Sequence, residues 1–212
     1  IPKDNMQMKS NQQGNNSSAD VLTPDWLENT VKMAIAQGHR PIPMVNKNQP
    51  AGCFSNGQTY PLDHPLWKTT APDIVSIALD DFLLLDYDGN KPKGALPLAE
   101  LFDILGDKPN VVQVNDDENS LHYLYRIPEG IDKDTLRHSN DNWLHGVDIK
   151  VMNQLMHLKR HKTIIDGELP TLDKVPDAPQ AIIDALTKVT SESLQARSDS
   201  PAGKLQAAEI VG

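Results

Sequence analysis

The segment that most constrains how this chain can fold is Leu83 to Gly89, with the sequence LLLDYDG. A short apolar run that ends in turn residues predicts a buried β-strand. Because successive side chains of a strand point to opposite faces, Asp86 and Asp88 face the same way. Two neighbouring carboxylates repel each other unless a cation lies between them, and hard oxygen ligands suit Mg²⁺ or Mn²⁺. The simpler alternative is a strand that ends in an acidic turn.

A second predicted strand carries the sequence SLHYLYR from Ser120 to Arg126. Its alternation places Ser120, His122 and Arg126 on one face and the apolar residues between them on the other, toward the core. Hydroxyl, imidazole and guanidinium groups on one face suit an anion such as a phosphate. The alternative for this strand by itself is an ordinary solvated sheet face.

A third predicted strand contains His145 to Lys150, with the sequence HGVDIK. Asp148 and Lys150 share the face opposite to the intervening apolar residues. Asp148 could complete a three-carboxylate site with Asp86 and Asp88, and Lys150 would then lie beside it, available to a phosphate. Without the other two motifs, this pattern would indicate only a surface salt bridge.

Taken together, the three motifs predict a site for phosphoryl or nucleotidyl transfer. Carboxylates that hold metal ions, next to cationic groups that hold phosphates, provide positioning and charge neutralisation, which dominate this chemistry. Two metal ions about 4 Å apart can activate an attacking hydroxyl and stabilise a leaving pyrophosphate.

The rest of the pattern favours an α+β fold over a doubly wound parallel sheet, because helices interleave with strands and some strands are expected to pair as hairpins. Helices are expected at 25–37, after the Thr23-Pro24-Asp25 start signal, and at 96–105 and 179–196. Strands are expected at 41–45, 75–79, 82–88, 110–114, 120–127 and 146–152. Two hairpins are expected, one turning at Asp80-Asp81 and one joining 154–158 to 163–165 through a basic turn.

Composition excludes several classes of protein. No apolar run of the 212-residue chain approaches the length of about 20 residues that spans a bilayer, so no membrane partner is expected. The single cysteine, Cys53, excludes an internal disulfide and a zinc site built on cysteine pairs, and it favours a reducing compartment. The formal charge of −9 argues at face value against nonspecific nucleic-acid binding.

The two ends of the chain differ from its middle. Residues 1–20 are rich in Asn, Gln and Ser and predict a disordered leader, while 21–197 carry all the predicted elements. Residues 198–212 are small and polar. They are interpreted either as a frayed tail or as a linker toward a further C-terminal domain.

The order of the three motifs resembles that of the primase-polymerase (Prim-Pol) domains of the archaeo-eukaryotic primase superfamily, found in phage, plasmid and archaeal replication proteins. That pattern is an apolar strand ending in D-x-D, then S-x-H on a strand, then an apolar strand with a single Asp. Here these are LLLDYDG, SLHYLYR and GVDIK, and the resemblance covers roughly residues 24 to 190. It implies a primase-like core: a mixed or antiparallel, RRM-like sheet flanked by helices, with a small N-terminal α/β unit.

The resemblance also implies an activity, which is template-directed synthesis from dNTPs or NTPs as a DNA primase, a DNA polymerase or both. Its implied partners are a single-stranded DNA template and a primer, and relatives often continue into a C-terminal helicase domain. The implied setting is the cytoplasm of a bacterial host, in the replication of a phage, plasmid or similar element. Metal-bound carboxylates would neutralise part of the −9 charge, so weak, salt-sensitive DNA binding is expected.

The resemblance assigns roles to five residues. Asp86, Asp88 and Asp148 would hold two Mg²⁺ or Mn²⁺ ions, His122 would contact the nucleotide triphosphate, and Ser120 would help to orient it. Position and charge add further candidates, namely Arg126 and Lys150 for the nucleotide and the turn residues Lys159, Arg160 and Lys162 for the template. The alternative for that turn is a solvated hairpin tip.

Two other functions remain open on the sequence. A haloacid-dehalogenase-type phosphatase also begins with an apolar strand ending in D-x-D-G, and there Asp86 would be the nucleophile and Asp88 the acid/base. That interpretation leaves the S-x-H strand and Asp148 unexplained. The other alternative is a non-catalytic replication initiator that binds origin DNA, which the acidic balance and the lack of a broad basic helix disfavour.

Overall fold

The computed structural model describes residues 25–92, 94–106, 111–115, 119–136 and 139–187. The predicted leader, 1–20, and tail, 198–212, lie outside these residues, as do the Thr23 and Pro24 of the first helix start. The expected division into a leader, a domain and a tail therefore stays a prediction.

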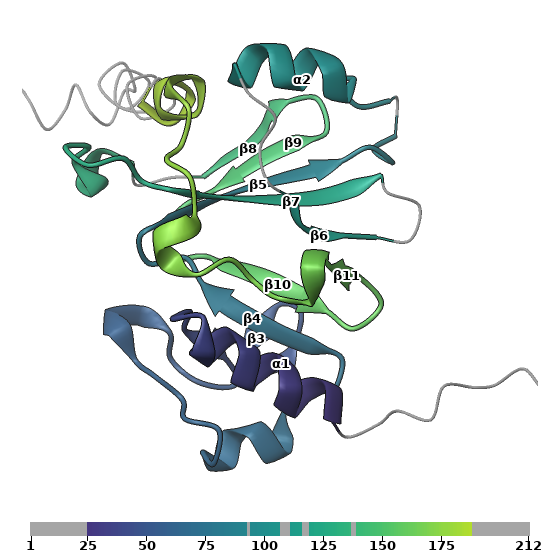
Figure 1. The fold of residues 1–212 in the computed structure, drawn as a ribbon, viewed down its shortest axis with the longest axis vertical. Coiled ribbons are helices and arrows are strands. Elements are labelled where there is room, and N and C mark those ends of the chain that lie inside the picture. Colours follow the sequence, from purple (N-terminus) through teal and green to yellow (C-terminus); the bar gives the residue numbers. More distant parts are fainter. Residues whose placement is uncertain (1–24, 93, 107–110, 116–118, 137–138, 188–212) are drawn as a thin grey trace, which may run out of the picture.

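The described residues form an α+β fold, as predicted (Figure 1). The named α-helices are α1 (Asp25–Ala36) and α2 (Leu98–Leu105), and residues 180–187 are also helical. The strands are β1 (Pro41–Ile42), β2 (Met44–Asn46), β3 (Gln49–Pro50), β4 (Ile74–Ala78), β5 (Phe82–Asp88), β6 (Val111–Val114), β7 (Ser120–Arg126), β8 (Asn140–Leu144), β9 (Val147–Lys150), β10 (Leu155–Lys159) and β11 (Thr163–Ile164).

Two larger sheets organise these strands. One has six strands in the order β11-β6-β7-β5-β9-β8, and the other has three in the order β1-β4-β10. Strands β2 and β3 form a separate pair. All the pairings between neighbouring strands are antiparallel, which agrees with the α+β prediction.

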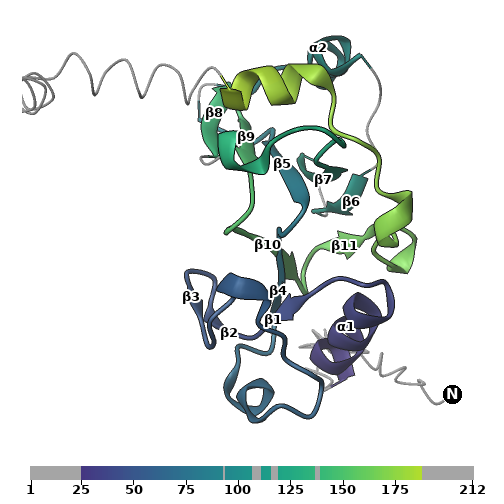
Figure 2. The ribbon, with the colours of Figure 1, turned by 90° about the vertical axis from the view of Figure 1, so that its left-hand side faces the viewer.

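The six-stranded sheet lies between two layers, with helices on one side and the three-stranded sheet and α1 on the other (Figures 1 and 2). On one face, Leu83 and Leu85 of β5 pack with α2 and the 180–187 helix in one hydrophobic core. On the other face, Phe82 and Leu84 join a second core with α1 and the three-stranded sheet. The central strands are therefore buried on both sides, and a polar side chain there lies between layers rather than in solvent.

Helix signals in the sequence located both named helices well. Val31 and Ala34 of α1 are buried as the periodicity predicts, although Ile35, from the same apolar repeat, is 43 % exposed. Pro97 is the N-cap of α2, and Gly106 ends it with a φ of 73°. The left-handed conformation at this position is one that glycine adopts at little cost.

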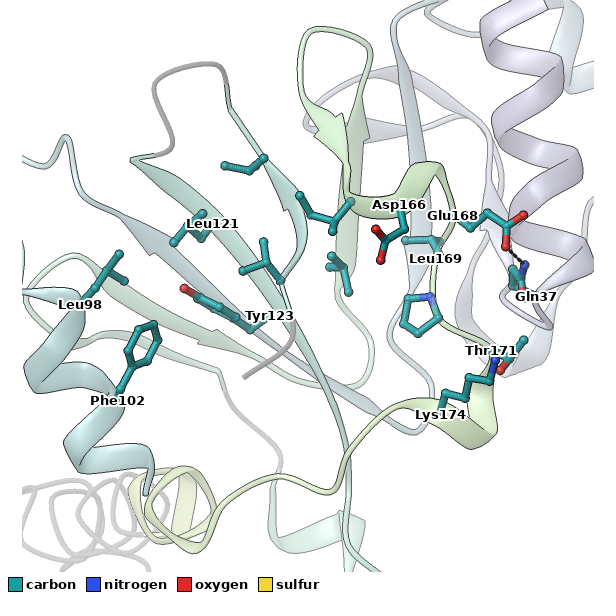
Figure 3. Close-up of a pocket in the computed structure, with 15 residues that line it drawn as sticks. Gln37, Leu98, Phe102, Leu121, Tyr123, Asp166, Glu168, Leu169, Thr171 and Lys174 are labelled. Carbon is teal, nitrogen blue, oxygen red and sulfur yellow. Dashed lines mark hydrogen bonds between the residues drawn. The ribbon is translucent and has the colours of Figure 1, made fainter. Parts of the chain in front are cut away.

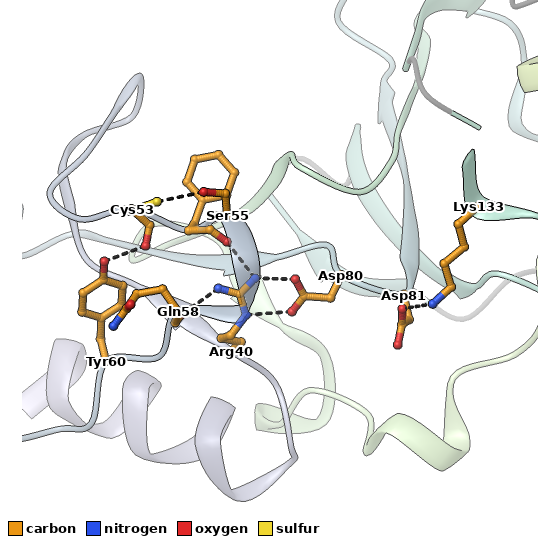
Figure 4. Close-up of polar contacts among 9 residues, drawn as sticks. Arg40, Cys53, Ser55, Gln58, Tyr60, Asp80, Asp81 and Lys133 are labelled. Atoms are coloured by element: carbon orange, nitrogen blue, oxygen red, sulfur yellow. Dashed lines mark hydrogen bonds and ion pairs between the residues drawn. The ribbon is translucent and has the colours of Figure 1, made fainter. Parts of the chain in front are cut away.

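The hairpin predicted at Asp80-Asp81 is wrong, because β4 and β5 belong to different sheets. The two acids lie at a crossing, where the chain passes from the three-stranded sheet to the six-stranded sheet. Each acid pairs with its own basic residue (Figure 4). Arg40 donates to the Asp80 carboxylate and also to the backbone oxygens of Phe54 and Gln58, whereas Lys133 pairs with Asp81. The chain is thereby anchored on both sides of the crossing.

The second predicted hairpin is also wrong. β10 pairs with β4 in the three-stranded sheet, while β11 pairs with β6 in the six-stranded sheet. The basic turn between them is therefore a second crossing between the layers. This geometry carries Lys162 toward the polar face of β7, where its ammonium donates to the Ser120 hydroxyl.

Candidate active site

The strand register places the three sequence motifs side by side. β5 lies between β7 and β9, and Asp86 is directly opposite His122 on one neighbour and Asp148 on the other. Asp88 is directly opposite Ser120. Directly paired residues of neighbouring antiparallel strands lie about 5 Å apart and point to the same face.

Along β5, the face that carries the aspartates starts apolar and becomes acidic. Phe82 and Leu84 fill the core between the two sheets, and Asp86 and Asp88 follow at the next two positions of the same face. The site therefore lies in the layer between the sheets, at the edge of a hydrophobic core. This location shields the carboxylates from water without closing them off.

Gly146 allows β9 to approach the end of β5. Its φ is 80°, and its carbonyl accepts from the Asp88 backbone N–H at 2.8 Å. A Cβ at this position would lie 2.9 Å from the Asp88 carbonyl oxygen and 2.5 Å from the Ala95 Cβ. Glycine is thus required here both by conformation and by space, and Asp148 follows two residues later.

Asp86 is the most constrained acid of the site. Its Oδ2 accepts from the Lys150 ammonium at 2.8 Å, and His122 Nε2 lies 3.3 Å from its Oδ1. Burial by itself would raise the pKa of Asp86, but the hydrogen bond from His122 and the Lys150 charge outweigh it and hold that pKa below its usual range. Asp86 is therefore a carboxylate at neutral pH.

Backbone amides orient the other two acids. Asp88 Oδ1 accepts from the backbone N–H of Asn90 at 3.1 Å, and Asp148 Oδ1 accepts from that of Asn142 at 2.6 Å. Asn142 has a φ of 56°, so the backbone of β8 is locally bent where it meets Asp148.

A cavity of about 280 Å³ opens at these side chains. It is lined by three acids, four lysines, two histidines and a serine: Asp86, Asp88, Asp148, Lys91, Lys150, Lys159, Lys162, His122, His157 and Ser120. Burial and the neighbouring Lys159 lower the pKa of Lys162 from its ordinary value. A small cavity lined by both carboxylates and ammonium groups suits a ligand that brings both metal ions and phosphates.

The carboxylates fit hard divalent cations in kind, since all three are oxygen donors on adjacent strands. Within the described residues, however, no group of three His, Cys, Asp or Glu side chains is arranged to hold a metal ion as it stands. Lys150 occupies one oxygen of Asp86. A metal ion at that oxygen would compete with this ammonium.

Two predicted site residues lie elsewhere. Arg126 is at the far end of β7, where its guanidinium pairs with Asp177 at 2.7 Å and stays 46 % exposed. Arg160 does not line the cavity, and its backbone N–H donates to the Asp73 carbonyl at 3.0 Å. Sharing a strand face or a turn with a site residue did not bring either of them to the site.

Three residues at the site were not predicted, namely Lys91, His157 and Gln113. His157 lines the cavity from β10, and its Nδ1 lies 2.7 Å from the Ser76 hydroxyl. Gln113 is buried behind His122. The only signal in the sequence for Gln113 is one polar residue within the apolar strand VVQV, and His157 stands in a segment whose predicted pairing was wrong.

A larger cavity of about 840 Å³ lies on the opposite face of β7 (Figure 3). Phe102, Leu121 and Tyr123 form its apolar side, and a hydrogen bond from Gln37 to Glu168 stands at its other end. It contains none of the paired acids and lysines of the smaller cavity. Size alone does not make it the better candidate, because the smaller cavity holds the groups that can do chemistry.

No protein-family model matches the chain, and no curated protein matches it significantly. None of the helices in the described part of the chain is long and apolar enough to cross a membrane.

Proposed function

We propose that this protein is a metal-dependent nucleotidyltransferase of the primase-polymerase type, which extends or starts a DNA strand on a template. The observation that carries the proposal is the register that sets Asp86 directly between His122 and Asp148, with Asp88 opposite Ser120. Three motifs that are distant in the sequence thus converge on one cavity. The antiparallel six-stranded sheet with helices on one face supports a primase-like core.

The acids and the cations of the cavity would have different tasks. Asp86, Asp88 and Asp148 would hold Mg²⁺ or Mn²⁺, and these ions would activate the primer hydroxyl and stabilise the leaving pyrophosphate. His122 and Ser120 would orient the triphosphate of the incoming nucleotide. Lys150, released from Asp86 as the cations take its place, would be available to a phosphate oxygen.

The lysines of the β10–β11 crossing fit the nucleotide better than the template. Lys159 and Lys162 line the same cavity as Asp86, and the Lys162 ammonium lies 2.8 Å from the Ser120 hydroxyl. We therefore move both lysines from the template, where the sequence placed them, to the phosphates of the incoming nucleotide. Arg126 and Arg160 have no part in the proposed site.

The remaining partners follow from the proposed reaction. They are a single-stranded DNA template, a primer and dNTPs or NTPs, with a helicase domain in a longer form of the chain as a further expectation. Replication of a phage, plasmid or similar element in a bacterial cytoplasm is the setting that the motif resemblance supports.

The test is extension of a labelled primer on a DNA template with dNTPs and either Mg²⁺ or Mn²⁺. We expect the wild-type chain to extend the primer and Asp86→Asn to lose at least about a hundredfold in rate, because a site carboxylate has been removed. Asp177→Asn is the matched control, since it makes the same change in the exposed ion pair with Arg126 of β7. Equal extension by wild type and Asp86→Asn would refute the site.

The same assay separates the alternatives. Release of phosphate from small phosphoesters without primer extension would favour a phosphatase with Asp86 as the nucleophile. That function leaves His122 and Asp148 without a role beside Asp86. Sequence-specific binding of duplex DNA without any nucleotide incorporation would favour a replication initiator.

A further inference from the structure

Gln113 of β6 is a buried amide directly behind the candidate site. It is 1 % exposed and lies opposite His122 in the β6–β7 ladder. A buried amide without partners would be costly, so its hydrogen bonds describe what it does. It contacts three groups: the backbone N–H of Lys159, the backbone carbonyl of His157 and the ring of His122.

The two backbone contacts fix the orientation of this amide. The Lys159 N–H, 3.1 Å from Oε1, can only donate, and the His157 carbonyl, 3.1 Å from Nε2, can only accept. Exchanging the oxygen and nitrogen of Gln113 would place donor against donor and acceptor against acceptor. The amide therefore cannot be flipped, although amide flips are usually ambiguous.

The fixed amide determines where the proton of His122 lies. Gln113 Nε2 is 3.1 Å from His122 Nδ1, and an amide nitrogen can only donate. His122 Nδ1 must therefore accept, which leaves the ring proton on Nε2. That nitrogen is the one that lies 3.3 Å from Asp86 Oδ1 inside the cavity.

We propose that Gln113 is a positioning residue that holds His122 as the Nε2–H tautomer, so that the imidazole presents a donor to the cavity. The consequence of this inference rests on the proposed function. When the nucleotide replaces the contact with Asp86, the Nε2–H is available to a triphosphate oxygen. Because the same amide holds the Lys159 backbone, Gln113 also ties β10 of the three-stranded sheet to β6 and β7. One side chain thus aligns a histidine and a lysine of the cavity.

The direct test is the protonation of the His122 ring in the metal-free, nucleotide-free chain. Long-range ¹H–¹⁵N correlation spectra report which ring nitrogen of each histidine carries the proton, and His122→Asn identifies the signals of His122 among the seven histidines. We expect a proton on Nε2 and none on Nδ1 in the wild type. A protonated Nδ1 in the wild type would overturn the proposal, whether or not any variant folds.

Gln113→Glu sharpens the test, because it keeps the acceptor for Lys159 and removes both donors. We expect His122 to gain a proton on Nδ1, which now faces a carboxylate, and the KM for the nucleotide to rise about tenfold with a smaller change in kcat. Gln154→Glu is the matched control, since Gln154 also accepts from a backbone N–H and donates to a side chain, that of Ser139, outside the cavity. It should change neither the tautomer nor the KM.

The outcomes distinguish this inference from the proposed function. If Nδ1 of His122 stays unprotonated in a folded Gln113→Glu chain, or if that chain keeps the wild-type KM, Gln113 does not position His122 and the inference fails. If the wild type shows the Nε2–H tautomer and the variant changes it, but no chain extends a primer, the positioning stands and the proposed function fails.

Discussion

Two pairs of aspartates lie close together in the chain and behave in opposite ways. Asp80 and Asp81 are consecutive, so they point to different sides, and each pairs with a separate base, Arg40 or Lys133 (Figure 4). Asp86 and Asp88 are two residues apart on a strand, so they point to one face and line one cavity. Nearby acids and bases therefore define a site only when the backbone makes them converge.

Burial separates the two regions further. The side chain of Asp81 is 63 % exposed in its pair with Lys133, whereas that of Asp86 is 23 % exposed in its pair with Lys150. An exposed pair is screened by water and contributes little, while partly buried charges interact strongly with each other and with a ligand. Matched changes in the two regions should therefore have very different effects.

The largest contrast is expected from the two lysines. Lys150→Met removes a charge from the cavity and should lower nucleotide incorporation about a hundredfold, because a desolvated charge contact to a phosphate is lost. Lys133→Met makes the same change in the exposed pair and should stay within about twofold of the wild type. The measurement is primer extension at subsaturating nucleotide. Equal losses in both variants would erase the distinction between the two regions.

The next contrast concerns pH and His157. Burial lowers the pKa of His157 to about 4, and the charges of Lys150 and Lys159 act in the same direction. In the unfolded chain this imidazole has its ordinary pKa of about 6.5, so between these values the unfolded state binds more protons. The free energy of unfolding is therefore not reduced by this group above about pH 6.5, and it is progressively reduced as the pH falls toward 4.

The expected reduction of the free energy of unfolding from this single group is roughly 2 to 3 kcal/mol. His157→Gln should show a smaller fall in the free energy of unfolding between pH 7 and pH 4.5 than the wild type, measured by urea denaturation at each pH. His161→Gln, on the exposed turn that follows β10, serves as the control and should follow the wild type. Parallel curves for His157→Gln and wild type would contradict the assignment.

Arg40 should matter for stability and not for chemistry. Its guanidinium joins Asp80 to two backbone carbonyls at one crossing between the sheets. Arg40→Met should lower the free energy of unfolding by about 2 kcal/mol, because three acceptors lose their donors. Arg126→Met, in an exposed pair, is the control. Activity of the folded Arg40→Met chain, assayed below its unfolding midpoint, should equal that of the wild type.

The smallest effect is expected at Asp81. Asp81→Asn should change the free energy of unfolding by less than about 0.5 kcal/mol, because the side chains of Asp81 and Lys133 are 63 % and 48 % exposed. Urea denaturation at low and high salt checks this prediction. A larger loss that disappears in high salt would mean that the Asp81–Lys133 ion pair stabilises the fold more than its exposure indicates.

Much of the candidate site was predictable because it depends on alternation along single strands. The facing directions of Asp86, Asp88, Ser120, His122, Asp148 and Lys150 follow from period two, and the register then brings these residues together. Arg126 shows the limit of that reasoning. It shares a face with His122, yet four residues along a strand is about 13 Å, too far for one small cavity.

What the sequence could not provide is the pairing of distant segments. Both predicted hairpins assumed that neighbours in the chain are neighbours in a sheet, whereas β4 pairs with β1 and β10, and β11 pairs with β6. These pairings bring His157 and Lys159 to the cavity and place Gln113 behind it. No local pattern encodes such contacts, because they depend on which sheet each strand joins.

The interleaving of the two sheets also limits how this molecule can be divided. β10, which follows β9 in the chain, completes a sheet whose other strands, β1 and β4, come from the N-terminal part. A fragment that started at β5 would keep every acid of the motifs and yet leave β10 without its sheet. The candidate site therefore cannot be transplanted as the six-stranded sheet alone, and a shortened or chimeric chain must retain the residues from α1 through β11.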